Sequence, residues 1–296
     1  MRRLKSITQT IEFMRILTLP LFFSFLSLPF CFPIEAAKPI GKRATKSLFT
    51  NFPNQKGASK KLVWSDEFNT AGSIDTNKWA FNIGTGDAGW GNNELEYYTK
   101  NKKNARIEKG HLIIEAVKEK IGGMEYSSAR LLTKGKAAWT YGRFEIRAKL
   151  TKGVGTWPAI WMLGSNIDQV GWPTCGEIDI MEHVGKSLNE INWSAHSKLY
   201  NWPKGTQKTA KAMVDHVTDS FHVYTLDWSK SALQFYVDNQ LYLTVPNENK
   251  STDYYPFVAP QFLLLNLAIG GGFGGPTIDN SIFPVRMEVD YVRVYQ

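Results

Sequence analysis

The segment CGEIDIMEHVG, which begins at Cys175, carries three carboxylates that could act together in acid and base chemistry: Glu177, Asp179 and Glu182. Side chains two residues apart in a β-strand point to the same face, so Glu177 and Asp179 share one face while the neighbouring isoleucines point to the core. Simple alternation would place Met181, and not Glu182, on the acidic face. A β-bulge near Met181 would shift the phase by one residue and bring all three acids to one surface.

Three like charges on one surface raise one another's pKa, which is costly in a structural strand and useful in a catalytic one. Retaining glycosidases need an ionised carboxylate as nucleophile and a protonated carboxylic acid as acid/base, about 5 Å apart. The Cα atoms of Glu177 and Glu182 would lie further apart than this, but long side chains can lean together on a concave sheet. Asp179 between them can hydrogen-bond the nucleophile. The alternative is a metal-binding or solvated acidic strand.

Aromatic and amide side chains in two other segments suit a groove for a neutral polysaccharide. GTWPAIWML places Trp157 and Trp161 just before the acidic strand, and GWGNNELEYYT supplies a further set: Trp90, Asn92, Asn93, Glu94 and Glu96. Indole faces stack on the apolar faces of sugar rings, and amide or carboxylate side chains bond the hydroxyls. The chain has 10 tryptophans, all after the N-terminal leader, and three of them are expected in the core: Trp64, Trp79 and Trp228.

The elements that must position these side chains are strands. From Lys61 onward, short runs rich in aromatic and β-branched residues alternate with Gly, Asn, Asp and Pro clusters, which is typical of a sandwich or barrel. YGRFEIRAKL, residues 141–150, alternates strictly and predicts a half-buried antiparallel strand. Asp238 and Asn239 between two apolar runs predict a hairpin. A short helical turn is expected around residues 208–216. The fold prediction is an all-β antiparallel sandwich with a curved sheet.

The N-terminal region predicts export. Basic residues in positions 1–15 are followed by the uncharged apolar run ILTLPLFFSFLSLPFCF, and PIEAAKP offers a small-residue cleavage site after Ala36. Residues 1–36 are therefore expected to be a signal peptide, residues 37–60 a flexible tail and residues 61–296 one catalytic domain. The alternatives are a permanent membrane anchor, for which the run is short and interrupted by prolines, and a lipidated Cys31, which follows the bulky Phe30. After cleavage only Cys175 would remain, so no internal disulfide is expected.

The net charge of +8 does not indicate a nucleic-acid-binding face. Of 35 basic and 27 acidic residues, 11 and 2 fall in residues 1–61, which leaves 24 and 25 in the remainder. The predicted domain is thus near neutral, and we expect no nucleic-acid partner. No other segment is long and apolar enough to span a membrane. We expect an exported, soluble monomer, secreted or periplasmic.

The motifs described above resemble glycoside hydrolase family 16, and within it the bacterial laminarinases, which are endo-β-1,3-glucanases. The resemblance covers residues 61–296 and rests on WSDEF, NNELEYYT, SARLLTKGK, YGRFEIRAKL, GTWPAIWMLG, GWPTCGEIDIMEHVG, WSAHS, LNLAIGG and DYVRVYQ. It implies a concanavalin-like jelly roll with a concave substrate groove. It also implies roles for the acids: Glu177 as nucleophile, Asp179 as assisting carboxylate and Glu182 as acid/base.

The resemblance implies further site residues. Positions implied to bind substrate are Trp157, Trp161, Asn92, Arg130 and His196, although a histidine in a strand taken alone indicates no ligand. Many members hold a structural calcium ion on the convex face, and the matching oxygen donors are the carbonyls of Glu67 and Gly110 and the carboxylate and carbonyl of Asp290. No cofactor is expected for catalysis. The glycine loop, residues 270–275, departs from the commoner pattern through Phe273, so its groove contacts stay open.

The resulting hypothesis is hydrolysis of internal β-1,3-glucosidic bonds of laminarin-type β-glucan with retention of configuration. Rivals of the same fold are a mixed-linkage β-1,3-1,4-glucanase and a hydrolase of sulfated or neutral galactan, although sulfate would favour more basic groove residues than this chain offers. A rival of another class is a β-glucan-binding lectin without activity, which is disfavoured because all three carboxylates are present.

Overall fold

The computed structural model describes residues 60–296. The predicted signal peptide and residues 37–59 of the predicted tail lie outside the described residues. Among the helices of residues 60–296, none is long and apolar enough to cross a membrane.

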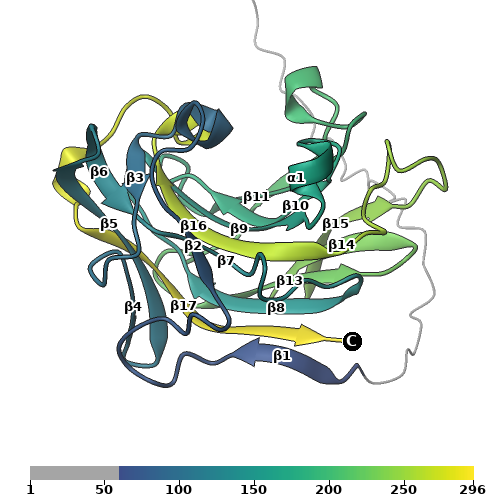
Figure 1. Cartoon of the computed structure of the whole chain (residues 1–296), viewed down its shortest axis with the longest axis horizontal. Helices are drawn as coiled ribbons and strands as arrows, with labels where there is room; N and C mark the ends of the chain where they lie inside the picture. The colour runs from purple at the N-terminus through teal and green to yellow at the C-terminus, as the bar shows by residue number, and fades with distance from the viewer. Residues whose placement is uncertain (1–59) are drawn as a thin grey trace, which may run out of the picture. The chain divides into compact units, whose positions relative to one another are not determined.

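The larger of two sheets has ten strands in the order β15-β14-β13-β8-β17-β5-β6-β3, with β1 beside β17 and β4 beside β5 (Figure 1). The strands of this sheet are β1 (Leu62–Asp66), β3 (Glu96–Tyr98), β4 (Ala105–Glu108), β5 (His111–Ile121), β6 (Met124–Ser128), β8 (Gly142–Lys149), β13 (His222–Trp228), β14 (Ala232–Val237), β15 (Gln240–Pro246) and β17 (Val285–Tyr295). Within the described residues β3 and β6 pair in parallel, and the other strand pairs are antiparallel.

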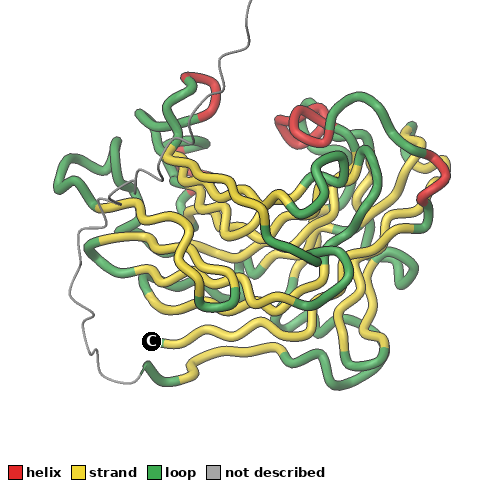
Figure 2. The backbone as a smooth tube through the Cα atoms, turned by 180° about the vertical axis from the view of Figure 1, so that it is seen from behind, coloured by secondary structure: helices red, strands yellow, loops and turns green. Residues whose placement is uncertain are grey.

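The second sheet has seven strands in the order β12-β11-β10-β9-β16-β7-β2. They are β2 (Ala80–Asn82), β7 (Arg130–Leu132), β9 (Thr156–Gly164), β10 (Glu177–His183), β11 (Glu190–His196), β12 (Lys208–Met213) and β16 (Gln261–Ile269). The helical segments are short: η1 (Gly89–Asn93), α1 (Ile167–Val170), η2 (Trp202–Lys204), α2 (Gly271–Gly274) and η3 (Asn280–Ile282). Figure 2 shows that strands form the body of the fold and that helices occur only within the connecting segments. The predicted antiparallel sandwich is confirmed.

One hydrophobic core joins the two sheets. In β8 the residues alternate between buried and half-buried, as predicted for residues 141–150, and Phe144 and Ile146 are fully buried. They share one cluster with Ile160, Ile178 and Leu265 of the seven-stranded sheet. Burial of apolar surface on both inner faces is the main stabilising term of such a sandwich.

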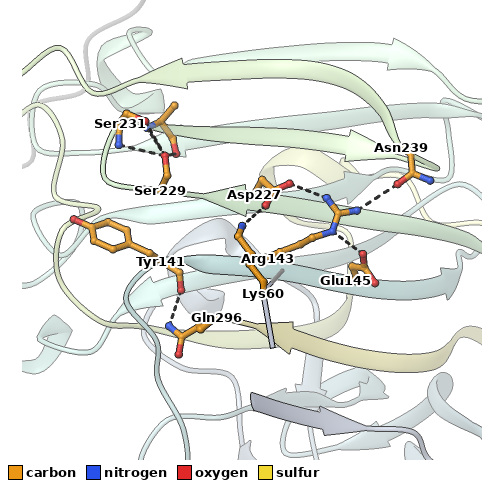
Figure 3. A network of polar contacts seen from close by, with 10 residues as sticks. Lys60, Tyr141, Arg143, Glu145, Asp227, Ser229, Ser231, Asn239 and Gln296 are labelled. Carbon is orange, nitrogen blue, oxygen red and sulfur yellow. Dashed lines mark hydrogen bonds and ion pairs between the residues drawn. The ribbon is translucent and has the colours of Figure 1, made fainter. Parts of the chain in front are cut away.

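The outer face of the ten-stranded sheet carries cross-strand polar pairs. The guanidinium of Arg143 donates to Glu145, Asp227 and Asn239 at 2.7, 2.7 and 3.3 Å (Figure 3). Lys60 pairs with the other oxygen of Asp227 at 2.6 Å. These partly exposed pairs each contribute little to stability. They leave this outer face, which points away from the seven-stranded sheet, with charged side chains that are paired.

Two local predictions have opposite outcomes. Asp238 and Asn239 both adopt positive φ (48° and 69°) between β14 and β15, so the predicted hairpin is confirmed. The helical turn expected around residues 208–216 is wrong, because residues 208–213 form strand β12, which pairs with β11 over six residues. The backbone hydrogen bonds of this edge strand outweigh the helical preference of its alanines and lysines.

The three tryptophans expected in the core contact it. Trp79 and Trp228 are buried, and Trp64 is half-buried and packs against the same cluster. The indole nitrogen of Trp79 donates to Asp66 at 2.8 Å and that of Trp228 to the carbonyl of Phe257 at 3.0 Å. Both buried indoles thus satisfy their polar atom, as burial requires.

Candidate active site

The predicted β-bulge is present in β10. On the side of β9, Asp179 pairs with Trp161 and Met181 with Ile160, so the register shifts by one residue between them. On the side of β11, Asp179 pairs with Ser194 and Glu182 with Asn192, which leaves Trp193 opposite both bulge residues. The bulge residues Ile180 and Met181 are both fully buried. Two successive side chains therefore enter the core, and Glu182 returns to the face of Glu177 and Asp179.

The three acids line a cleft of about 720 Å³ on the outer face of the seven-stranded sheet. Strand β10 is an interior strand, so lining residues continue on both sides of it. On one side lie Trp157 and Trp161 of β9, Asn266 of β16 and Arg130 of β7. On the other lie His196 of β11 and Thr209 and Lys211 of β12. We call these sides the β9 arm and the β11 arm.

Loops form the walls at both ends of the cleft. In Figure 1 the loops with η1 and α2 rise above the sheet on one side, and those with α1 and η2 rise on the other. Cleft residues from these loops are Trp90, Asn92 and Glu94 near η1, Phe273 in α2, Trp172 after α1 and Trp202 in η2.

Each of the two glutamates accepts a hydrogen bond from an indole. Trp172 Nε1 donates to Glu177 Oε2 at 2.8 Å, and Trp157 Nε1 donates to Glu182 Oε1 at 3.0 Å. The ring of Phe273 meets the ring of Trp157 edge-on at 5.6 Å. These donors orient the two carboxylates and favour their ionised forms.

His196 contacts two of the three acids, Asp179 and Glu177. Its Nε2 lies 3.2 Å from Asp179 Oδ2 and 3.8 Å from Glu177 Oε1. Asp179 is only 3% exposed, and apart from this contact its Oδ2 has no hydrogen-bond partner within residues 60–296. Among these residues, Glu177, Asp179 and His196 form the one group of three metal-type side chains close enough to share an ion. The same group fits proton chemistry, because it lies next to Glu182 on the cleft face.

Burial and mutual repulsion raise the pKa of every acid in the cluster. Loss of hydration and the charge of Asp179 raise the pKa of Glu177 to about 8, and loss of hydration and the charge of Glu177 raise the pKa of Glu182 to about 7. Burial and the charge of Glu182 raise the pKa of Asp179 well above its usual range. Acids this close lose protons in steps that belong to the cluster. The cluster therefore holds protons at neutral pH, as acid catalysis requires.

Arg130 is held between two indoles in the β9 arm. Its guanidinium carbon lies 4.8 Å from the centre of the Trp90 ring and 4.7 Å from that of Trp161. Trp161 Nε1 donates to Asn266 at 2.7 Å, and Asn266 in turn donates to the hydroxyl of Tyr98 at 3.1 Å. Cation–π stacking and this chain of hydrogen bonds fix the aromatic faces that line the arm.

Asn92 enters the same arm through the left-handed turn of η1. Its amide donates to Glu94 Oε1 at 3.2 Å, and Tyr98 donates to Glu94 Oε2 at 2.9 Å. Gly89 has φ +59°, and a Cβ there would lie 2.5 Å from the nitrogen of Glu94. Only glycine therefore allows the turn to pack this closely against Glu94.

The cleft thus brings together all eight residues predicted from the acidic motif and from the resemblance: Glu177, Asp179, Glu182, Trp157, Trp161, Asn92, Arg130 and His196. Sequence reasoning missed Trp172, Trp202, Gln207 and Asn266, and it left the groove contacts of Phe273 open. Asn93 and Glu96 of the predicted groove set do not line the cleft. For two of the missed residues the sequence contains a feature that could have indicated the cleft. Trp172 lies five residues before Glu177, and Asn266 is the polar residue in the apolar run FLLLNLAI.

The three positions predicted for calcium lie outside the cleft: Asp290 on β17, Glu67 just after β1 and Gly110 just before β5. Strand β17 pairs with β5 up to Val289, opposite Leu112, and with β1 from Val292, opposite Asp66, so Asp290 lies between the two pairings and Glu67 and Gly110 lie next to their ends. The carboxylate of Asp290 accepts from Arg147 at 2.5 Å, and that of Glu67 accepts from Arg293 at 2.7 and 3.0 Å.

Comparisons with known proteins agree with this architecture. The sequence profile described as glycosyl hydrolases family 16 matches residues 91–293. A β-glucanase of Rhodothermus marinus is 47% identical over 253 residues, which cover 82% of this chain and 87% of the relative. A glucan endo-1,3-β-glucosidase of Cryptopygus antarcticus is 40% identical over 255 residues, covering 78% and 90%.

A solved structure matches as well. The crystal structure of the laminarinase from Rhodothermus marinus superposes with a TM-score of 0.77 at 46% identity, covering 80% of this chain and 97% of that one. This chain thus shares its sandwich fold with a solved enzyme structure. The chain belongs to glycosyl hydrolases family 16 and is a glycoside hydrolase.

Proposed function

We propose that this enzyme hydrolyses internal β-1,3-glucosidic bonds of laminarin-type β-glucan with retention of configuration. The observation that carries the proposal is the bulged strand β10, which places three acids on one face in the middle of an aromatic cleft. Because the cleft extends over the β9 arm and the β11 arm, a chain can continue past the acids in both directions. This arrangement supports internal rather than terminal cleavage.

The mechanism follows from the surroundings of each acid. Glu182 protonates the leaving glycosidic oxygen while ionised Glu177 attacks the anomeric carbon, and a glycosyl–enzyme bond forms as the glycosidic bond breaks. Glu182 then takes a proton from the water that hydrolyses this intermediate. The reactive state has Glu177 ionised and Glu182 protonated, although burial and the charge of Asp179 raise the pKa of Glu177 to about 8, above the pKa of about 7 for Glu182. Trp172 and the nearby His196 oppose that rise and favour the ionised form of Glu177, so the reactive state is one of the protonation states of the coupled cluster. No step requires a cofactor.

The lining of the cleft supports a neutral glucan as the substrate. Among residues 60–296 it has two Lys or Arg residues: Arg130 is covered by two indoles, and Lys211 pairs with Glu190 at 3.1 Å. A sulfated galactan would be expected to require free cations. The names of the relatives, β-glucanase and glucan endo-1,3-β-glucosidase, support the same substrate class.

We expect laminarin to release more reducing ends than lichenan or agarose, with oligosaccharides of several lengths as first products. Proton NMR of the first product anomers tests retention. A higher rate on lichenan would establish a mixed-linkage enzyme, and a higher rate on agarose would establish a galactan hydrolase. Binding of laminarin without any release of reducing ends would establish a lectin.

Replacing either glutamate should strongly lower turnover, because Glu177 forms the bond to the sugar and Glu182 transfers the proton. We expect Glu177→Gln and Glu182→Gln to lower kcat on laminarin by roughly 10³-fold or more, because each removes a group that bonds or transfers a proton in the transition state. A dinitrophenyl glycoside, whose leaving group needs no proton, should restore the first step in Glu182→Gln only. Glu125→Gln, at an exposed position outside the cleft, serves as the control. Wild-type activity of either cleft variant would contradict the assignment.

The raised pKa of Glu177 predicts a pH-dependent stability. In the folded state Glu177 keeps its proton up to about pH 8, whereas in the unfolded state it loses the proton near pH 4.5. Binding of this proton therefore stabilises the folded state fully below pH 4.5, and the stabilisation is lost as pH rises to 8. At pH 8 Glu177→Gln should therefore unfold at a higher temperature than wild type, and its free energy of unfolding should be larger by on the order of a few kcal/mol. At pH 4 the two should unfold alike. Equal melting curves of the variant and wild type at pH 8 would show that folding does not raise the pKa of Glu177.

We also propose a structural calcium ion held by the carbonyls of Glu67 and Gly110 and by Asp290. Hard oxygen donors suit calcium, and the pairing of β17 supports their meeting at one junction. The ion would share the Asp290 carboxylate with Arg147.

Removal of calcium by EDTA should lower the melting temperature by roughly 5–10 °C, and millimolar calcium should restore it, because only the folded state assembles these donors. Asp290→Asn should weaken the response, whereas Glu125→Gln should keep it. An unchanged melting temperature in EDTA would rule the ion out.

We propose, finally, that the protein is exported, with residues 1–36 as a signal peptide and residues 37–60 as a tail. The basic start and the uncharged apolar run support this. N-terminal sequencing of protein from the periplasm or medium should begin at Ala37. Full-length chain recovered from the membrane fraction would contradict it.

A further inference from the structure

The β11 arm ends at an unusually exposed indole. Trp202 in η2 is 57% exposed, yet it lines the same cleft as the acids. Within residues 60–296 no aromatic ring or cation packs on it, in contrast to the stacked indoles of the β9 arm. An exposed indole inside a binding cleft loses the free energy that its burial would supply, and a ligand that covers it would recover that free energy.

The loop that carries Trp202 is well braced. Asn201 is 2% exposed, and its amide donates to the carbonyls of Ser197 and Lys198 at 3.1 and 3.0 Å. Thr206 donates its hydroxyl to the carbonyl of Leu199 at 2.9 Å, and its amide N–H bonds the carbonyl of Asn201 at 3.1 Å. The exposure of the indole is therefore set by an ordered loop, and little ordering entropy is lost when a ligand stacks on it.

Two amide side chains of the same arm have atoms without partners. Gln207 lies just before β12, and Asn192 lies on β11 opposite Glu182 of β10. Gln207 Oε1 and Asn192 Nδ2 are shielded from solvent and have no hydrogen-bond partner within the described residues. Their neighbours Ser194 and Thr209, in contrast, bond each other at 3.1 Å. A sugar hydroxyl, which both donates and accepts, can satisfy either atom once its amide turns toward the cleft that both residues line.

We propose that Trp202 and Gln207 form an outer sugar-binding subsite of the β11 arm, which binds a neutral glucosyl residue of the chain beyond those at the acids. The indole stacks on the apolar face of the ring, and the amide of Gln207 turns toward the cleft so that its Oε1 accepts from a hydroxyl. This inference rests on the proposed function and adds the part of the cleft that selects longer chains.

The subsite has a consequence for where a chain is cut. The β9 arm holds a chain through Trp157 and Trp161, and the outer subsite holds it at the other end of the cleft. A chain long enough to occupy both arms gains binding free energy on each side of Glu177 and Glu182. Its bonds near the middle are then cut more often than its terminal bonds.

The test is the cleavage pattern of end-labelled β-1,3-gluco-oligosaccharides of three to eight units, with kcat/KM measured for each length. In wild type kcat/KM should rise with length. In Trp202→Ala the rise should be lost for the longest chains, by roughly five- to tenfold, because one stacking contact is removed. The bond cut most often in the longest chain should also move. A merely structural role would lower all rates equally and leave the bond frequencies unchanged.

Matched variants separate the contributions. Trp202→Phe should keep part of the length dependence, since a smaller aromatic face remains, and Gln207→Ala should give a weaker loss of the same kind. Leu241→Ala on β15, 39% exposed and outside the cleft, should behave as wild type. Unchanged bond frequencies in Trp202→Ala would overturn the subsite while leaving the proposed function intact. A wild-type enzyme that cuts none of these oligosaccharides would overturn both.

Discussion

The site depends on one extra residue in strand β10. Trp193 of β11 faces both Ile180 and Met181, and both of these side chains enter the core. The bulge lies between the two glutamates, so it sets the phase of Glu182 relative to Glu177. An unbulged strand would bury a carboxylate or expose a methionine, and either would separate the acid from the nucleophile.

The core must offset the cost of this arrangement. Three acids with raised pKa values lie on a strand whose other side chains are fully buried, and ionising them in such surroundings opposes folding. Indole donors at Glu177 and Glu182 recover part of that cost. The remainder is carried by apolar contact between the two sheets, which is why the acidic strand is also one of the most deeply packed.

The two arms of the cleft are built in different ways. In the β9 arm the aromatic faces are fixed by stacking on Arg130 and by hydrogen bonds through Asn266. In the β11 arm the indole of Trp202 stands on a braced loop with its face open. Fixed aromatic faces in one arm and a braced loop in the other both limit the entropy that the protein loses when a chain binds.

The sequence by itself determined the sandwich, the acidic face and the hairpin at Asp238, because strand alternation and turn chemistry are local properties. It also indicated that a bulge was needed, since the spacing of the acids breaks a period of two. Tertiary structure decided what depends on distant segments. Residues 208–213 became a strand because β11 offered a partner, and Trp172 reached Glu177 through a loop. The exposure of Trp202 likewise follows from hydrogen bonds made by its loop, which no periodicity of the sequence records.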